Sequence, residues 1–123
     1  MSWLAVAVGG ALGACARFGL GSAIVPLLGI NAAWATFTVN LLGSFCIGIA
    51  MTLLVEQGAS ELLRVFAVTG FLGAFTTYSA FSLDTLSLLQ QGNYNGAFGL
   101  AAATLCLCLA ATYCGYFLAK AVF

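Results

Sequence analysis

The chain has 123 residues, of which 63% are hydrophobic and only 5% are charged; its formal net charge is zero and it contains no histidine. Soluble domains carry about 25% charged residues, so these few charges could not cover a soluble fold of this size, and we expect membrane lipid to surround the outer surface. Nucleic-acid binding is excluded, because three basic residues cannot form the basic patch that it requires.

Four apolar segments are long enough to cross a membrane, since a helix needs about 20 residues to span a hydrocarbon core about 30 Å thick. They run from about Trp3 to Leu28 (with an earlier end near Gly21 as an alternative), Ala32 to Val55, Leu62 to Leu89 and Tyr94 to Leu118. No basic region precedes the first segment, so we expect a retained span rather than a cleaved signal. The sequence therefore predicts an all-α membrane protein with a single four-helix transmembrane domain, 1–123.

The first helix carries a charge, Arg17, within the stretch GGALGACARF. Ionisable residues inside a membrane are costly and are functional candidates by default, and a positive charge at the mouth of a pore would concentrate anions. The alternative is an arginine whose charged end extends to the membrane interface. The spacing Gly9-x3-Gly13 in the same helix is typical of close helix contacts in lipid.

The second helix contains Asn40 near the middle of its apolar span, in the stretch TVNLLGSFCIG. Its amide has two N–H donors, which could bind an anion. A buried asparagine in a membrane also commonly joins neighbouring helices by hydrogen bonds. The sequence leaves both roles open.

The third helix is the most informative, because its middle reads GFLGAFTTYSAFS and is rich in glycine and hydroxyl groups. Such a stretch is a weak helix centre, and a break here would free backbone carbonyls in a place where broken membrane helices commonly hold ions. The alternative is a continuous helix whose hydroxyls bond back to the preceding turn, which is the commoner outcome for such residues.

Two rows of side chains at a spacing of three run through this stretch. Hydroxyls can donate hydrogen bonds to an anion, and an aromatic ring has a positive edge that an anion can approach in the ring plane. Both rows could therefore replace water around a small anion. The alternative, which is commoner for aromatic rows, is that the rings pack against neighbouring helices. The aromatic row is Phe75, Tyr78 and Phe81, and the hydroxyl row is Thr76, Ser79 and Ser82.

The charges hardly favour one orientation in the membrane. Four helices place both termini on one side, where Arg64 and Lys120 lie, while Arg17 lies towards the other side. Orientation follows the excess of lysine and arginine, and an excess of one residue predicts insertion in both directions. Four short helices enclose too little space for a pore, so an oligomer is expected.

No catalytic constellation is visible. The sequence contains no nucleophile with a base, no carboxylate pair and no phosphate-binding loop, and Asp84 stands alone. The five cysteines lie in apolar runs without a CxxC pair, so we interpret them as small packing residues. We therefore expect a protein that is not an enzyme.

The three stretches quoted above, in this order on four helices, resemble the Fluc (CrcB) family of fluoride channels over nearly the whole chain. The QGNY sequence at the start of the fourth helix also fits. The resemblance implies an antiparallel, dual-topology homodimer in the plasma (inner) membrane, with two fluoride pores at the subunit interface. It also implies a structural Na⁺ ion at the dimer centre, bound by backbone carbonyls at the break in the third helix, here those of Gly73 and Thr76.

The same resemblance assigns the fluoride pathway. The family's pair of pore phenylalanines falls on Tyr78 and Phe81. Three positions depart from the family pattern: Tyr78 replaces a phenylalanine, Ala80 stands where threonine is common, and Cys108 stands where serine is frequent. The implied pathway residues are Arg17, Asn40, Tyr78, Ser79, Phe81, Ser82 and Thr112.

Two other functions compete with a channel. Small dual-topology multidrug exporters have four helices and a similar length, but their coupling needs a titratable acid in the first helix. The first helix here has only Arg17, which stays protonated. A purely structural subunit would explain the glycines but not Asn40 and the two rows together. The sequence therefore favours passive conduction, which expels fluoride from a cell with an inside-negative potential.

Overall fold

The computed structural model describes all residues, 1–123, and is entirely helical. The helical segments form four rods, each a run of one or more consecutive helices. The rods are long and apolar enough to cross a membrane: Ser2–Leu28, Ala32–Glu56, Glu61–Gln90 and Tyr94–Val122. They confirm the four predicted spans, the last of which continues four residues beyond the predicted Leu118. The alternative end of the first helix near Gly21 is wrong, because the helix continues to Leu28 and stops at Gly29, whose φ of 63° favours glycine.

The rods contain eight helical segments. The first rod is α1 (Ser2–Leu28), and the second is α2 (Ala32–Ala50) continued by the π-helical η1 (Met51–Glu56). The third consists of α3 (Glu61–Arg64), π-helical η2 (Val65–Leu72), α4 (Gly73–Phe75) and α5 (Tyr78–Gln90), and the fourth is α6 (Tyr94–Val122). Side chains cap the second, third and fourth rods, because the Asn31, Ser60 and Asn93 oxygens accept N–H groups of the first turn.

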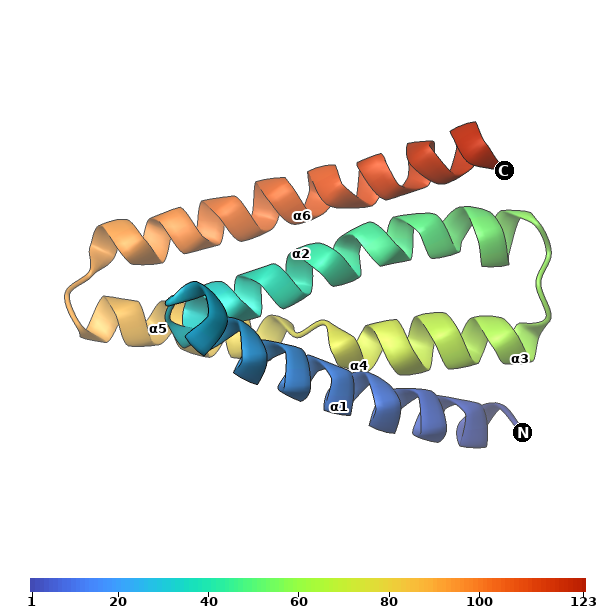
Figure 1. The fold of residues 1–123 in the computed structure, drawn as a ribbon, viewed down its shortest axis with the longest axis horizontal. Coiled ribbons are helices and arrows are strands. Elements are labelled where there is room, and N and C mark those ends of the chain that lie inside the picture. Colours follow the sequence, from blue (N-terminus) through green and yellow to red (C-terminus); the bar gives the residue numbers. More distant parts are fainter.

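The rods lie side by side, with α1 and α6 outermost (Figure 1). Both termini lie at the end where the second rod turns into the third, as four consecutive spans require. The most extensive contacts join α2 with α6 and α1 with η2. The second and third rods therefore form the middle of the bundle.

Glycines allow these rods to approach at backbone distance. A Cβ on Gly48 would overlap the Thr112 carbonyl oxygen of α6, and a Cβ on Gly13 would overlap the Phe71 carbonyl oxygen of η2. The predicted close approach at Gly9-x3-Gly13 is thus present, since Gly9 is equally close to the Phe66 carbonyl.

Most of the apolar surface faces outwards. Only 18 of 123 residues are buried, and large side chains such as Phe18 and Phe98 are 78% and 70% exposed. In water such a surface would cause aggregation, whereas in a bilayer the lipid chains cover it. The protein is therefore a multi-pass membrane protein.

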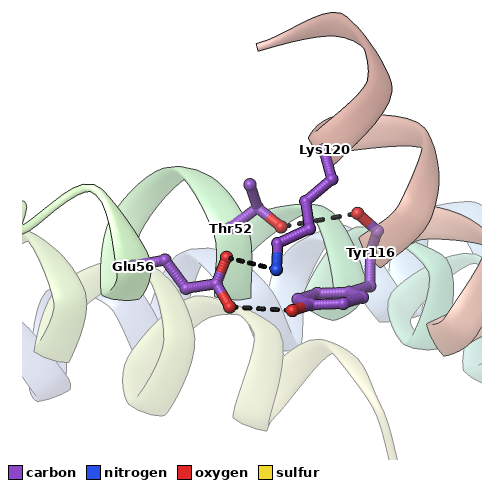
Figure 2. A network of polar contacts seen from close by, with 4 residues as sticks. All are labelled: Thr52, Glu56, Tyr116 and Lys120. Carbon is purple, nitrogen blue, oxygen red and sulfur yellow. Dashed lines mark hydrogen bonds and ion pairs between the residues drawn. The ribbon is translucent and has the colours of Figure 1, made fainter.

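One polar network ties α6 to the second rod near the terminal end of the bundle (Figure 2). The Tyr116 hydroxyl donates to Glu56 Oε1 at 2.8 Å, and Lys120 Nζ lies 3.5 Å from Glu56 Oε2. The same ammonium lies 4.7 Å from the centre of the Tyr116 ring. Thr52 Oγ1 completes the network by donating to the Tyr116 carbonyl at 3.4 Å.

Candidate functional site

The third rod is interrupted at two threonines. Helix α4 ends at Phe75 and α5 begins at Tyr78, while Thr76 (φ −83°, ψ 157°) and Thr77 (φ −151°, ψ 117°) are extended. Consecutive β-branched residues are poor helix formers, and the Thr77 hydroxyl starts the next helix by accepting the Ala80 N–H at 3.2 Å. Backbone groups are therefore released from the helical pattern in the middle of a membrane-spanning rod.

Asn40 of α2 binds this interruption through both ends of its amide. Its Nδ2 donates to the Thr77 carbonyl at 2.9 Å, and its Oδ1 accepts the Thr77 N–H at 2.7 Å. The side chain is only 7% exposed. The contact joins two helices, and because the amide has two N–H groups and this pair uses one, a donor remains for a ligand.

Arg17 of α1 binds the interruption from another rod. Its Nε donates to the Ala74 carbonyl at 3.0 Å. In an unbroken helix that carbonyl would accept the Tyr78 N–H. A cation at the carboxyl end of a helix is stabilised by the helix dipole. Arg17 thus lies at the interruption itself, and it borders an open groove of about 280 Å³ together with Thr77 and Ala80.

Two further carbonyls lose their usual donors here. The Gly73 carbonyl would receive the Thr77 N–H, which goes to Asn40 instead. The Thr76 carbonyl would receive the Ala80 N–H, which goes to the Thr77 hydroxyl. Carbonyl oxygens freed in this way are ligands that suit a hard cation such as Na⁺, so the donor chemistry of these two positions fits the implied ion.

Tyr78 and Phe81 form an aromatic pair at the start of α5. Their ring centres lie 5.4 Å apart and the ring planes meet at 61°, an edge-on arrangement. Tyr78 is 79% exposed. Phe75 does not join them: it is buried and stacks on Phe71, because the extended threonines interrupt the helical spacing that would align it with Tyr78.

Asn40, Tyr78 and Phe81 line a common groove of about 310 Å³ between α2, α5 and α6. From α6 the groove is bordered by Thr104 and Cys108. Thr104 was not a sequence candidate, and only its position one helical turn before Cys108 could have indicated it.

Among the other candidate hydroxyls, Thr76 borders this groove and donates to the Leu72 carbonyl at 3.0 Å, and the rest lie outside the groove and are already hydrogen-bonded. Thr112 donates to the Ser44 carbonyl at 3.0 Å and the Cys108 carbonyl at 3.1 Å, which ties α6 to α2. Ser82 bonds back to the Tyr78 carbonyl at 3.0 Å, and Ser79 pairs with the Thr77 hydroxyl at 3.3 Å. Both serines are exposed on the surface of this chain.

Comparison with known proteins identifies the family of this chain and several of its relatives. The family model described as "CrcB-like protein, Camphor Resistance (CrcB)" matches residues 4–116, which include the interruption and its partners. The chain belongs to the CrcB family. Its relatives include a protein named fluoride-specific ion channel FluC 2 from Bradyrhizobium diazoefficiens, 45% identical over 94% of this chain and 87% of its own length.

Two other CrcB relatives are similar over nearly their full length. A fluoride-specific ion channel FluC from Thermus thermophilus is 43% identical and covers 98% of this chain and 96% of its own. One from Aeromonas salmonicida is 45% identical and covers 93% of this chain and 92% of its own.

Proposed function

We propose that this protein is a fluoride-selective passive channel that lowers intracellular fluoride by exporting it across the plasma (inner) membrane. The observation that carries the proposal is the groove in which an amide donor, Asn40, and two ring edges, Tyr78 and Phe81, meet beside the interrupted rod. The bacterial relatives described above are named as fluoride-specific ion channels. Conduction of this kind is not an enzymatic reaction.

These groups suit fluoride because they can replace its water. A small anion is strongly hydrated, so it enters an apolar path only where donors compensate the lost hydrogen bonds. The Asn40 amide supplies an N–H donor, and the rings supply positive edges. The exposed hydroxyls of Ser79 and Ser82 would add O–H donors after leaving their present partners, whereas the Thr112 hydroxyl is bonded to two carbonyls. The guanidinium of Arg17 raises the local concentration of anions.

The working unit is an antiparallel homodimer. The groove is open on one side in the single chain, and Tyr78 at its border is 79% exposed. A second copy of this chain would cover those rings and enclose the pathway, and an inverted copy is compatible with the nearly balanced charges at the two ends. The exposed Ser79 and Ser82 would then lie at the subunit contact.

The same unit holds a structural Na⁺ ion at its centre. Each chain would contribute the carbonyls of Gly73 and Thr76, whose helical donors are diverted to Asn40 and Thr77. When bound, the ion would offset the partial negative charge of these carbonyls where two chains meet. Asn40 and Arg17 keep the extended segment in place by binding Thr77 and Ala74.

Efflux from liposomes tests the function. Purified protein is reconstituted into vesicles loaded with potassium fluoride or potassium chloride, and release is followed with ion-selective electrodes after valinomycin is added. We expect fast fluoride release that depends on valinomycin, because a passive anion channel needs a compensating cation current, and negligible chloride release. Rapid chloride release would refute selectivity, and fluoride release at the same rate without valinomycin would refute passive conduction.

A further inference from the structure

Opposite charges occur twice at the terminal end of the bundle, but they pair only once. Glu56 and Lys120 approach to 3.5 Å and form the one ion pair of the chain. Glu61 and Arg64 stand three residues apart on α3, a spacing at which opposite charges on a helix can meet, yet they form no ion pair. Both side chains are exposed. They are therefore available to a molecule that itself carries both charges.

Glu61 and Arg64 border one groove between the second and third rods. Its volume is about 370 Å³, which is within the range of sites for small ligands. Thr69 and three valines complete the lining. The groove thus combines an acid, a base and an apolar wall, and the valines of that wall are Val55, Val65 and Val68.

This groove lies at the depth of the lipid headgroups. The third rod has 30 residues, which is about 45 Å at the rise of an α-helix, whereas the hydrocarbon core of a bilayer is about 30 Å thick. The first turn, with Glu61 and Arg64, therefore extends into the headgroup layer. Val65 and Val68 follow one turn further towards the hydrocarbon. A phospholipid is the molecule that has a charged group and an apolar chain at these two depths.

We propose that this groove binds the headgroup of a zwitterionic phospholipid with a primary ammonium, a phosphatidylethanolamine. Arg64 binds the phosphate, because the guanidinium fork of N–H donors matches phosphate oxygens. The Glu61 carboxylate accepts N–H groups of the ammonium, and Val65 and Val68 contact the acyl chain. Phosphatidylglycerol has no cation for Glu61, and the trimethylated ammonium of phosphatidylcholine has no N–H to donate. The inference concerns the fold in its membrane and does not depend on the ion that the protein conducts.

Native mass spectrometry tests the inference on the purified protein. The protein is titrated with phosphatidylethanolamine, phosphatidylcholine or phosphatidylglycerol of identical acyl chains, and thermal unfolding is measured with the same lipids. We expect phosphatidylethanolamine to bind about tenfold more tightly than the other two, the difference that follows from one hydrogen bond to a charged group. It should also raise the unfolding temperature more than they do, because it binds the folded state more tightly.

Three variants assign the preference to the groove. Glu61→Gln should bind phosphatidylglycerol as tightly as phosphatidylethanolamine, because the charged partner of the ammonium is gone while Arg64 still binds phosphate. Arg64→Gln should weaken the binding of all three lipids. Lys120→Gln is the matched control, since it removes one positive charge from the same end but from the pair with Glu56, and it should keep the preference.

Other outcomes overturn the inference. Equal binding of the three lipids by the unmodified protein, or a preference for phosphatidylglycerol, would make Arg64 an ordinary interfacial charge. An unchanged preference in Glu61→Gln would remove Glu61 from the site, and a loss in Lys120→Gln as large as in Glu61→Gln would assign the effect to the charge of the whole end. Fluoride efflux measured on the same preparations keeps the two questions apart, because absent flux with an intact lipid preference contradicts the proposed function alone.

Discussion

A substitution of Phe81 can distinguish a role in conduction from a role in packing. It borders the groove and meets Tyr78 edge-on, and it makes no hydrogen bond that a substitution would leave unsatisfied. Any effect of changing it must therefore come from the shape or the electrostatics of its ring.

Phe81→Ile is expected to abolish most fluoride flux while the protein stays folded. Isoleucine is apolar and bulky, so its cost in stability should stay below about 1.5 kcal/mol, but it lacks the positive ring edge. Tyr78→Phe should remain active and Tyr78→Ile should not. Efflux and elution from a sizing column measure both properties. Normal flux through both isoleucine variants would make the aromatic pair structural.

Asn40 has two roles that one substitution tests: it borders the groove, and it holds the backbone of Thr77. Asn40→Leu removes the donor to the groove and also leaves the Thr77 N–H and carbonyl unpaired. Flux should fall by one to two orders of magnitude, since hydrogen bonds to a charged group contribute about 1.5–3 kcal/mol, and each unpaired backbone group should cost about 1–3 kcal/mol of stability. Efflux and thermal unfolding measure the two losses. Unchanged stability would show that the contact with Thr77 is not structural, and unchanged flux would remove Asn40 from the pathway.

At the scale of elements, glycines decide how closely the rods approach. Gly48 of α2 and Gly115 of α6 each leave no space for a Cβ against the facing backbone, at Thr112 and Phe45. Backbone atoms cannot move aside as a flexible side chain can, so the two helices must separate to accept any larger residue.

Gly48→Ala is expected to lower stability by about 1–3 kcal/mol, the usual cost of overpacking, and to reduce flux by widening the groove between α2 and α6. Gly99→Ala is the matched control on α6, because a Cβ there meets nothing within 4 Å. It should keep full flux and stability. Thermal unfolding and efflux distinguish the two, and a Gly48→Ala protein as stable as the control would contradict the close approach.

At the scale of the whole molecule, the distribution of basic residues decides how strongly the chain prefers one orientation in the membrane. Orientation depends on the count of lysine and arginine, and the terminal end has two, Arg64 and Lys120, against Arg17 alone elsewhere. The bias towards either side is weak, which is the property that an antiparallel homodimer requires.

Added lysines should fix the orientation. Gln57→Lys with Ala59→Lys places two charges in the loop between the second and third rods and should hold the carboxyl terminus in the cytoplasm. Gln90→Lys with Gln91→Lys should hold it outside. Reporters fused to the carboxyl terminus read the side, and co-expression of the two locked forms should restore flux that each lacks alone. An unmodified protein that inserts in only one direction would exclude the antiparallel homodimer.

Sodium withdrawal tests the central ion. Replacing Na⁺ by a bulky organic cation on both sides of the vesicles should lower fluoride efflux, because the Gly73 and Thr76 carbonyls would lose their ligand. Restoring Na⁺ should recover the flux. Efflux that is identical with and without Na⁺, in vesicles purified free of it, would contradict the ion.

The sequence by itself determined the four spans, the membrane environment and the family. Spans depend on length and hydropathy, and the family depends on the order of the quoted stretches, so both can be read along one chain. The sequence also placed Asn40, Tyr78 and Phe81 among the candidates, through the resemblance and the rarity of polar residues in such spans.

Only the tertiary structure decided what these residues contact. Arg17 and Asn40 bind the backbone of Ala74 and Thr77, and because every residue has the same carbonyl and N–H, such partners leave no mark in the sequence. The separation of Phe75 from Tyr78 required the backbone angles of Thr76 and Thr77, which override helical spacing. Thr104 was identified from its place on the groove beside Asn40 and Phe81, because the packing of the helices decides which face of α6 meets α2 and α5.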